Sequence, residues 1–208
     1  MKRAIVLAFV AVALLAAGTA WVLIPAKPSE PFIEIGKDAY VLAEPEPIAP
    51  FRLVGHDGKA FDNAALKGRW SFLFFGFTHC PDICPTTLAV FNEVQRALRS
   101  SAGGAADVRF IMVTVDPERD TPQVLANYVP AFNPEFLGLT GEAGEIARLC
   151  DSLGVKYGKV PGATPASYHM DHSSSVLLAD PQGRFHAVFA PPHDAQNMTQ
   201  GFLEIRRR

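Results

Sequence analysis

The chain has 208 residues, of which 49% are hydrophobic and 19% are charged, and its formal net charge at pH 7 is −2. This apolar content excludes a wholly disordered chain, and the slightly acidic balance gives no electrostatic basis for binding nucleic acid. The three cysteines are too few for a fold that is held together by disulfides. The composition therefore indicates one ordinary globular domain with some additional chain.

An uncharged apolar stretch runs from Ala4 to Ile24 near the N-terminus. Because about 20 helical residues cross a hydrocarbon core, we expect residues 1–26 to form a single transmembrane helix that anchors the chain. Lys2 and Arg3 precede the stretch and favour a cytoplasmic N-terminus, which places the following domain in the periplasm and the anchor in the inner membrane. The alternative is a cleaved signal peptide, because Gly18-Thr19-Ala20 has small residues at the positions that a signal peptidase reads.

Residues 27–50 are rich in proline, which breaks helices and favours extended chain. We therefore expect a tether between the anchor and a globular domain at residues 51–208. The domain begins with two short apolar segments on either side of Asp57-Gly58, a pattern that predicts a β-hairpin.

Two continuous apolar runs, Trp70–Phe77 and Val108–Val115, are typical of strands that are buried on both faces. The hydrophobic periodicity and the capping residues predict further elements: helices over Asp82–Ser100, after Thr121, over Glu145–Leu153 and after Asp194, and strands over Ser174–Ala179 and Phe185–Phe189. The order hairpin, β, α, β, α, α, β, β, α is typical of an α/β protein with a thioredoxin-like fold.

The end of the first buried strand delivers two cysteines, Cys80 and Cys84, to the N-terminus of the next helix. Free backbone N–H groups and the helix dipole favour a thiolate at such a position. Residues four apart on a helix share one face about 6 Å apart, so the two sulfurs can form a disulfide or bind one metal ion. Two thiolates with one imidazole suit Cu(I), which prefers soft ligands. The alternative is an inert disulfide or a pair of ordinary buried thiols.

The segment Phe77–Pro85 resembles the signature of the SCO/SenC family, and Val115–Pro122, Phe136–Gly141 and Asp171-His172 match further segments of that family. The similarity extends over about residues 50–205. It implies a membrane-tethered, thioredoxin-like copper protein that helps to build the dinuclear copper centre of cytochrome c oxidase.

Carried over to this chain, the resemblance implies that Cys80, Cys84 and His172 bind copper, as Cu(I) or Cu(II). His172 lies just before the strand predicted to start at Ser174, and in a thioredoxin-like fold the loop that enters this strand packs beside the active-site helix. His169, three residues earlier on the same predicted loop, is the alternative histidine ligand.

Several neighbours of these residues are candidates for supporting the site. Asp171 is a possible hydrogen-bond acceptor for the histidine ligand, and Asp82, between the cysteines, is a candidate helix cap. Asp116 ends the second buried strand beside the expected site, and His79 adjoins the first cysteine, whose thiolate it can tune. Each has a plain alternative as a solvated or turn residue. Cys150 is in phase with the apolar residues of its helix, so we expect it in the core.

Functions of two main classes fit these features. The first is a copper chaperone that takes copper from a periplasmic donor and delivers it to the copper subunit of a terminal cytochrome oxidase, the partner that the resemblance implies. The second is a thiol–disulfide oxidoreductase or thiol peroxidase, in which Cys80 attacks, Cys84 resolves and His172 is dispensable. A weaker third is a structural domain with an inert disulfide. The histidine favours copper, because a redox dithiol has no use for a third soft ligand.

Overall fold

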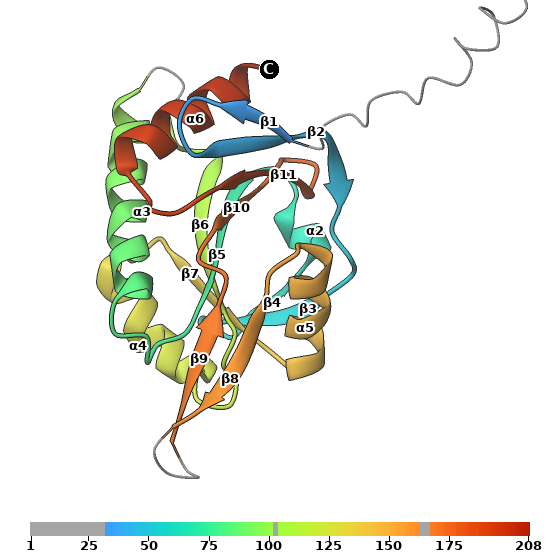
Figure 1. Cartoon of the computed structure of the whole chain (residues 1–208), viewed down its shortest axis with the longest axis vertical. Helices are drawn as coiled ribbons and strands as arrows, with labels where there is room; N and C mark the ends of the chain where they lie inside the picture. The colour runs from blue at the N-terminus through green and yellow to red at the C-terminus, as the bar shows by residue number, and fades with distance from the viewer. Residues whose placement is uncertain (1–31, 102–103, 163–166) are drawn as a thin grey trace, which may run out of the picture. The chain divides into compact units, whose positions relative to one another are not determined.

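A nine-stranded mixed sheet in the order β1-β2-β11-β10-β5-β6-β7-β3-β4 forms the centre of the protein (Figure 1). The structure is a computed structural model and describes residues 32–208 apart from 102–103 and 163–166. β5, β6 and β7 run parallel, and the other pairs in the sheet are antiparallel. The nine strands are β1 (Phe32–Ile35), β2 (Ala39–Pro47), β3 (Arg52–Gly55), β4 (Ala60–Asp62), β5 (Trp70–Gly76), β6 (Val108–Thr114), β7 (Leu137–Thr140), β10 (Val176–Ala179) and β11 (Arg184–Phe189).

Helices α3 and α6 pack against each other along the sheet (Figure 1). The unit β5–α3–β6 is a parallel βαβ half, and β10, β11 and α6 form the ββα half, which together make the predicted thioredoxin-like arrangement. Phe72 on β5 lies at the centre of the core, with ring contacts to α3 and α6. The helices are α2 (Asn63–Leu66), α3 (Ile83–Ser100), α4 (Pro122–Phe132), α5 (Ala143–Ser152) and α6 (Ala195–Arg207).

The predicted elements of the domain are present within one or two residues of their predicted limits. Two of the predicted caps are present, since Thr121 accepts a hydrogen bond from the Val124 N–H group and Asp194 accepts one from that of Asn197. Strand β7 and the short helix α2 were not predicted. The sheet and its helices therefore follow from apolar periodicity and capping, which are local features of the sequence.

The predicted tether is wrong for residues 32–47, which form β1 and β2 at one edge of the sheet. Ile35 and Ala39 are buried in the core, so apolar burial outweighs the proline content of the segment. Pro45 and Pro47 lie beyond the part of β2 that pairs with β1, where a missing N–H group disrupts no bond to that strand.

A separate two-stranded sheet corrects a second expectation, because residues 168–172 are not a loop. They form β9 (Tyr168–His172), which pairs with β8 (Tyr157–Pro161) in an antiparallel hairpin. The register places Tyr157 opposite His172 at one end of the hairpin, and Pro161 opposite Tyr168 at the other.

The predicted transmembrane anchor at residues 1–26 lies outside the described residues. Within the part of the chain that the structure describes, no helix is both long and apolar enough to cross a bilayer. The described residues from 32 to 208 belong to one compact unit.

Candidate metal centre

The two cysteines lie where β5 turns into α3. β5 ends at Gly76 and α3 begins at Ile83, so Cys84 is on the first turn of the helix, whereas Cys80 lies in the turn that precedes it. The Cys80 N–H group donates to the carbonyl of Phe77 at 3.2 Å, which closes this turn. Both thiols are free and buried. The turn, and not the helical spacing alone, therefore brings the sulfurs together.

Cys80, Cys84 and His172 form a group whose ligand atoms all lie within 4.8 Å of one another. The distance from Cys84 Sγ to His172 Nε2 is 3.7 Å. Metal bonds of about 2.0–2.3 Å to nitrogen and sulfur, as zinc makes, place two ligands of one ion up to ~4.6 Å apart. Only a small adjustment is therefore needed for this group to bind one ion.

The imidazole of His172 is oriented by its own strand end. Its Nδ1 lies 3.0 Å from the carbonyl oxygen of Ser173, to which it donates. In the neutral ring this leaves the lone pair on Nε2, the nitrogen that faces Cys84. The ring also packs edge-on against Phe74 and Phe77, with centroid distances of 6.0 and 5.7 Å. The histidine is thus presented in the tautomer that a metal ion requires.

Asp171 does not have the predicted role of orienting the imidazole. Its side chain is exposed, and the backbone carbonyl of Ser173 accepts from Nδ1 instead. Successive side chains of a strand point to opposite faces, so the neighbour of an inward-facing histidine faces outward.

Burial raises the pKa of the Cys84 thiol above its usual range. This finding opposes the expectation that the N-terminus of α3 favours a thiolate, because at a side chain with no exposed surface desolvation outweighs the helix dipole. Cys84 therefore keeps its proton in the metal-free protein. A bound cation would supply the positive charge that displaces this proton.

Three other candidates lie around the group without joining it. Asp82 occupies the position before α3, but its side chain makes no capping hydrogen bond, contrary to the prediction. His79 is exposed, and its Nδ1 lies 3.1 Å from Thr78 Oγ1. His169 is also exposed, and its ring packs against Phe77 at 5.4 Å. Cys150 lies in the core, as predicted, and burial raises its pKa to about 12.

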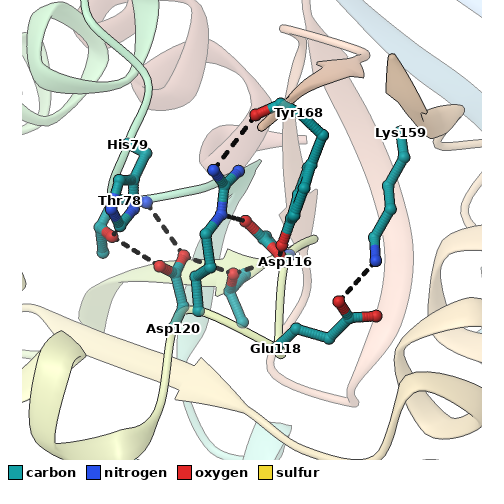
Figure 2. A network of polar contacts seen from close by, with 9 residues as sticks. Thr78, His79, Asp116, Glu118, Asp120, Lys159 and Tyr168 are labelled. Atoms are coloured by element: carbon teal, nitrogen blue, oxygen red, sulfur yellow. Dashed lines mark hydrogen bonds and ion pairs between the residues drawn. The ribbon is translucent and has the colours of Figure 1, made fainter. Parts of the chain in front are cut away.

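Asp120 is a buried residue of the site region that the sequence analysis did not single out. Its carboxylate accepts from the Thr78 N–H group at 2.9 Å, from the Thr78 hydroxyl at 2.5 Å and from the Thr114 hydroxyl at 2.7 Å (Figure 2). Thr78 lies in the turn that leads to Cys80, so Asp120 fastens this turn to the end of β6. The available signal was its place within the segment Val115–Pro122 that resembles the SCO/SenC family.

Asp116, which was predicted to lie beside the site, is fully buried and makes contacts with a more distant element. It accepts a hydrogen bond from the hydroxyl of Tyr168 at 2.7 Å and forms an ion pair with Arg119 (Figure 2). Tyr168 is the first residue of β9, the strand that ends in His172. Asp116 therefore acts on the hairpin, at the end away from the histidine.

Comparisons with known proteins identify the family of the chain. A family model described as SCO1/SenC matches residues 42–205. "Protein SCO2 homolog, mitochondrial" of Bos taurus is 40% identical over 149 residues, which are 72% of this chain and 56% of that protein. An "SCO2-like protein" of Rickettsia typhi is 36% identical over 177 residues, 83% of each chain. The chain spans about half the length of the mitochondrial relatives it matches.

Solved structures show the same likeness. The copper-bound crystal structure of ScoI from Arabidopsis thaliana is 37% identical, with a TM-score of 0.72, and the match covers 77% of this chain and 99% of that one. Copper-bound ScoI of Bradyrhizobium japonicum is 39% identical, with a TM-score of 0.67, over 76% and 97% of the two chains. The family model covers most of this chain, and the Cys–Cys–His group lies within the matched region. The chain therefore belongs to the SCO1/SenC family.

Proposed function

We propose that this protein binds one copper ion through Cys80, Cys84 and His172 and delivers it to the dinuclear copper centre of cytochrome c oxidase. The observation that carries the proposal is the convergence of two buried sulfurs and one imidazole nitrogen within 4.8 Å. Two related proteins, 37% and 39% identical to this chain, have solved structures with copper bound, which supports copper as the metal.

The donor set fits copper better than structural zinc. Structural zinc sites have four protein ligands, whereas the group found among the described residues has three, two of them soft sulfurs. Cu(I) accepts such a low-coordinate, sulfur-rich site. His172 Nε2 already has its lone pair directed at the sulfurs, and the two thiols lose their protons as the metal enters. Copper is here a cargo. An acceptor removes the ion by replacing these three ligands with its own.

The membrane anchor and the periplasmic location belong to the same proposal. The apolar stretch Ala4–Ile24 and the preceding Lys2 and Arg3 support a single-pass helix in the inner membrane, with the copper-binding domain in the periplasm. Between the predicted anchor and the first strand at Phe32, the sequence leaves residues 27–31, a shorter tether than predicted. The partners would be a periplasmic copper donor and the copper subunit of the oxidase.

A thiol–disulfide oxidoreductase is the second candidate function, and one observation favours it. Both sulfurs are free and lie within 4.8 Å of each other, so a small movement would allow a disulfide. Cys80 retains 8% exposure, whereas Cys84 has none, which assigns the attack to Cys80 and the resolving role to Cys84. His172 would have no part in this reaction.

An anaerobic Cu(I) titration of the reduced chain in detergent, against a competing chelator, tests the proposal. We expect one copper per chain. His172→Ala should weaken the affinity by more than the ~10–100-fold that the loss of an outer-shell partner costs. His169→Ala is the matched control, because this exposed histidine lies on the same strand outside the group, and it should bind as the wild type does. Weak Cu(I) binding that is the same in the wild type and in His172→Ala, together with disulfide-reductase turnover, would instead establish the oxidoreductase.

A further inference from the structure

The β8–β9 hairpin holds His172 at the end where its two strands join the rest of the domain. At this end the Ser173 N–H group donates to the Lys156 carbonyl at 2.7 Å, and the Lys156 N–H group donates to Ser173 Oγ at 2.9 Å, so these bonds tie the two strands to each other. Along β8 and β9, Met170 is the single buried residue. Apolar packing alone therefore holds this hairpin weakly, and the contacts at its far end matter for the position of the histidine.

These far contacts form a cluster of Asp116, Arg119 and Tyr168, called here the latch. Arg119 Nε donates to the Asp116 carboxylate, and its Nη1 donates to the Tyr168 carbonyl at 3.2 Å. The guanidinium also lies over the Tyr168 ring, 3.8 Å from its centroid. The Tyr168 hydroxyl completes the cluster by donating to Asp116 at 2.7 Å (Figure 2). A rigid cation thus joins a buried carboxylate of the β6–α4 loop to the backbone and ring of β9.

The latch also touches the cysteine side of the metal centre. Arg119 lies 5.8 Å from the ring centroid of Phe77, and that ring packs against His172. Phe77 accepts the hydrogen bond that closes the turn at Cys80. One side chain of the β6–α4 loop therefore contacts both the segment that leads to the cysteines and the strand that leads to the histidine.

A second attachment of the same hairpin provides an internal comparison. Lys159 on β8 forms an ion pair with Glu118, and their side chains are 47% and 65% exposed (Figure 2). The Asp116 side chain of the latch is 0% exposed. Water screens the outer pair, whereas the buried, charge-assisted bonds of the latch keep their strength. The latch should thus restrain the hairpin, and the outer pair should contribute little.

We propose that Asp116, Arg119 and Tyr168 are positioning residues for copper binding, which hold β9 against the domain so that His172 Nε2 stays beside the cysteine sulfurs. The inference rests on the proposed copper function. It requires that loosening the latch weakens binding only through His172, because the cysteines are placed by the main core and the Asp120 contacts.

A double-mutant cycle with Cu(I) and a competing chelator, on the full chain in detergent, tests this role. We expect Arg119→Ala to weaken the affinity about tenfold, at the lower end of the effect of outer-shell partners. Tyr168→Phe, which keeps the ring and the Asp116–Arg119 pair, should weaken it less. In the His172→Ala background, both changes should have no further effect, because their action passes through the missing ring. Glu118→Gln is the matched control on the same loop and should leave the affinity unchanged.

A metal-free measurement accompanies the cycle. Amide hydrogen exchange of the reduced, copper-free chain should become faster in β9 with Arg119→Ala and Tyr168→Phe, and stay unchanged in β5. Equal weakening with and without His172, or wild-type affinity in both latch variants, would overturn the positioning role. If the wild-type chain itself bound no Cu(I), the proposed function would fail instead, and the two failures are thereby distinguished.

Discussion

Cys80 and Cys84 belong to the main core, whereas His172 lies on a hairpin outside the nine-stranded sheet. All residues of β5 are buried, and α3 buries a full apolar stripe that starts with Cys84. Along β8 and β9, by contrast, only Met170 is buried, and partly buried rings and polar contacts provide the remaining attachment. Core packing tolerates little displacement, whereas a small hairpin held by hydrogen bonds opens at a lower free-energy cost.

The difference teaches that the metal centre has a rigid half and an adjustable half. We expect the sulfurs to keep their positions when the histidine is displaced, because core packing holds them. If the bound copper is a cargo, as proposed, its release is easier when one ligand can move away without unfolding of the domain. Substitutions in the core around the cysteines should therefore alter the metal affinity and the free energy of unfolding together. Substitutions on the hairpin should be able to alter one of these quantities without the other.

The largest effect is expected at the rigid half itself. Cys84→Ser removes a sulfur with no exposed surface and should lower the Cu(I) affinity by at least ~100-fold, since it deletes a ligand and not an outer-shell partner. Copper stoichiometry against a chelator measures the change. Cys150→Ser is the control, because this buried thiol lies on α5 outside the metal group, and the loss of a full equivalent in it would contradict the assignment.

Asp120 tests what fixes the cysteine turn. Asp120→Ala removes the acceptor of three hydrogen bonds, so the Thr78 N–H group and the hydroxyls of Thr78 and Thr114 lose their partner. This loss should lower the free energy of unfolding by about 2–4 kcal/mol. Urea denaturation of the metal-free chain provides the value. Asp171→Ala, an exposed acid on the hairpin, should stay within ~0.5 kcal/mol of the wild type. Similar losses in both variants would mean that the two halves do not differ.

Two glycines compare the packing of the halves directly. A Cβ at Gly76 would lie 2.7 Å from Cys84 Sγ and 2.8 Å from Phe74 Cε1, so Gly76→Ala should cost about 1–3 kcal/mol by overpacking and displace the sulfur. At Gly158, on β8, a Cβ meets nothing within 4 Å. Gly158→Ala should therefore fold and bind Cu(I) as the wild type does. Thermal unfolding and the copper titration measure both variants. Wild-type stability and copper affinity in Gly76→Ala would contradict the tight packing around the cysteines.

The smallest expected effect is a loss of stability at low pH, through His193 near the end of the hairpin that carries His172. His193 Nε2 donates to the carbonyl of Ser174, in the segment between β9 and β10, and burial lowers the pKa of His193. The unfolded chain, with an ordinary histidine pKa of about 6.5, then binds the proton more readily than the folded protein. The free energy of unfolding should accordingly fall as the pH drops through this value.

Urea denaturation of the metal-free chain at pH 7.5 and 5.5 measures this loss. His193→Gln keeps a donor for the Ser174 carbonyl but does not titrate, so it should lose less stability over the same interval. His186, whose pKa burial also lowers, accounts for part of the remaining change. An unaltered pH dependence in His193→Gln would show that His193 contributes nothing to it.

The failures of prediction have identifiable causes. β2 carries Pro45 and Pro47, which in a local view indicate an extended tether, and only the pairing of β2 with β11 joins β2, and β1 beside it, to the sheet. β8 and β9 are five residues each and bury only Met170, so they lack the run of apolar residues that marks a strand in the sequence. The roles of Asp120 and Arg119 depend on partners more than 40 residues away, Thr78 and Tyr168, which no spacing reveals.

The sequence by itself determined the central strands and helices, the two cysteines at the end of β5, and the family resemblance that singled out His172. These features depend on apolar periodicity and short spacings, which act within a few residues of chain. The tertiary structure decided the contact between Cys84 and His172, 88 residues apart, and the alternation along β9 that leaves His169 outside the group. It also decided the thiol state of Cys84, because the cost of charging a buried sulfur depends on everything packed around it.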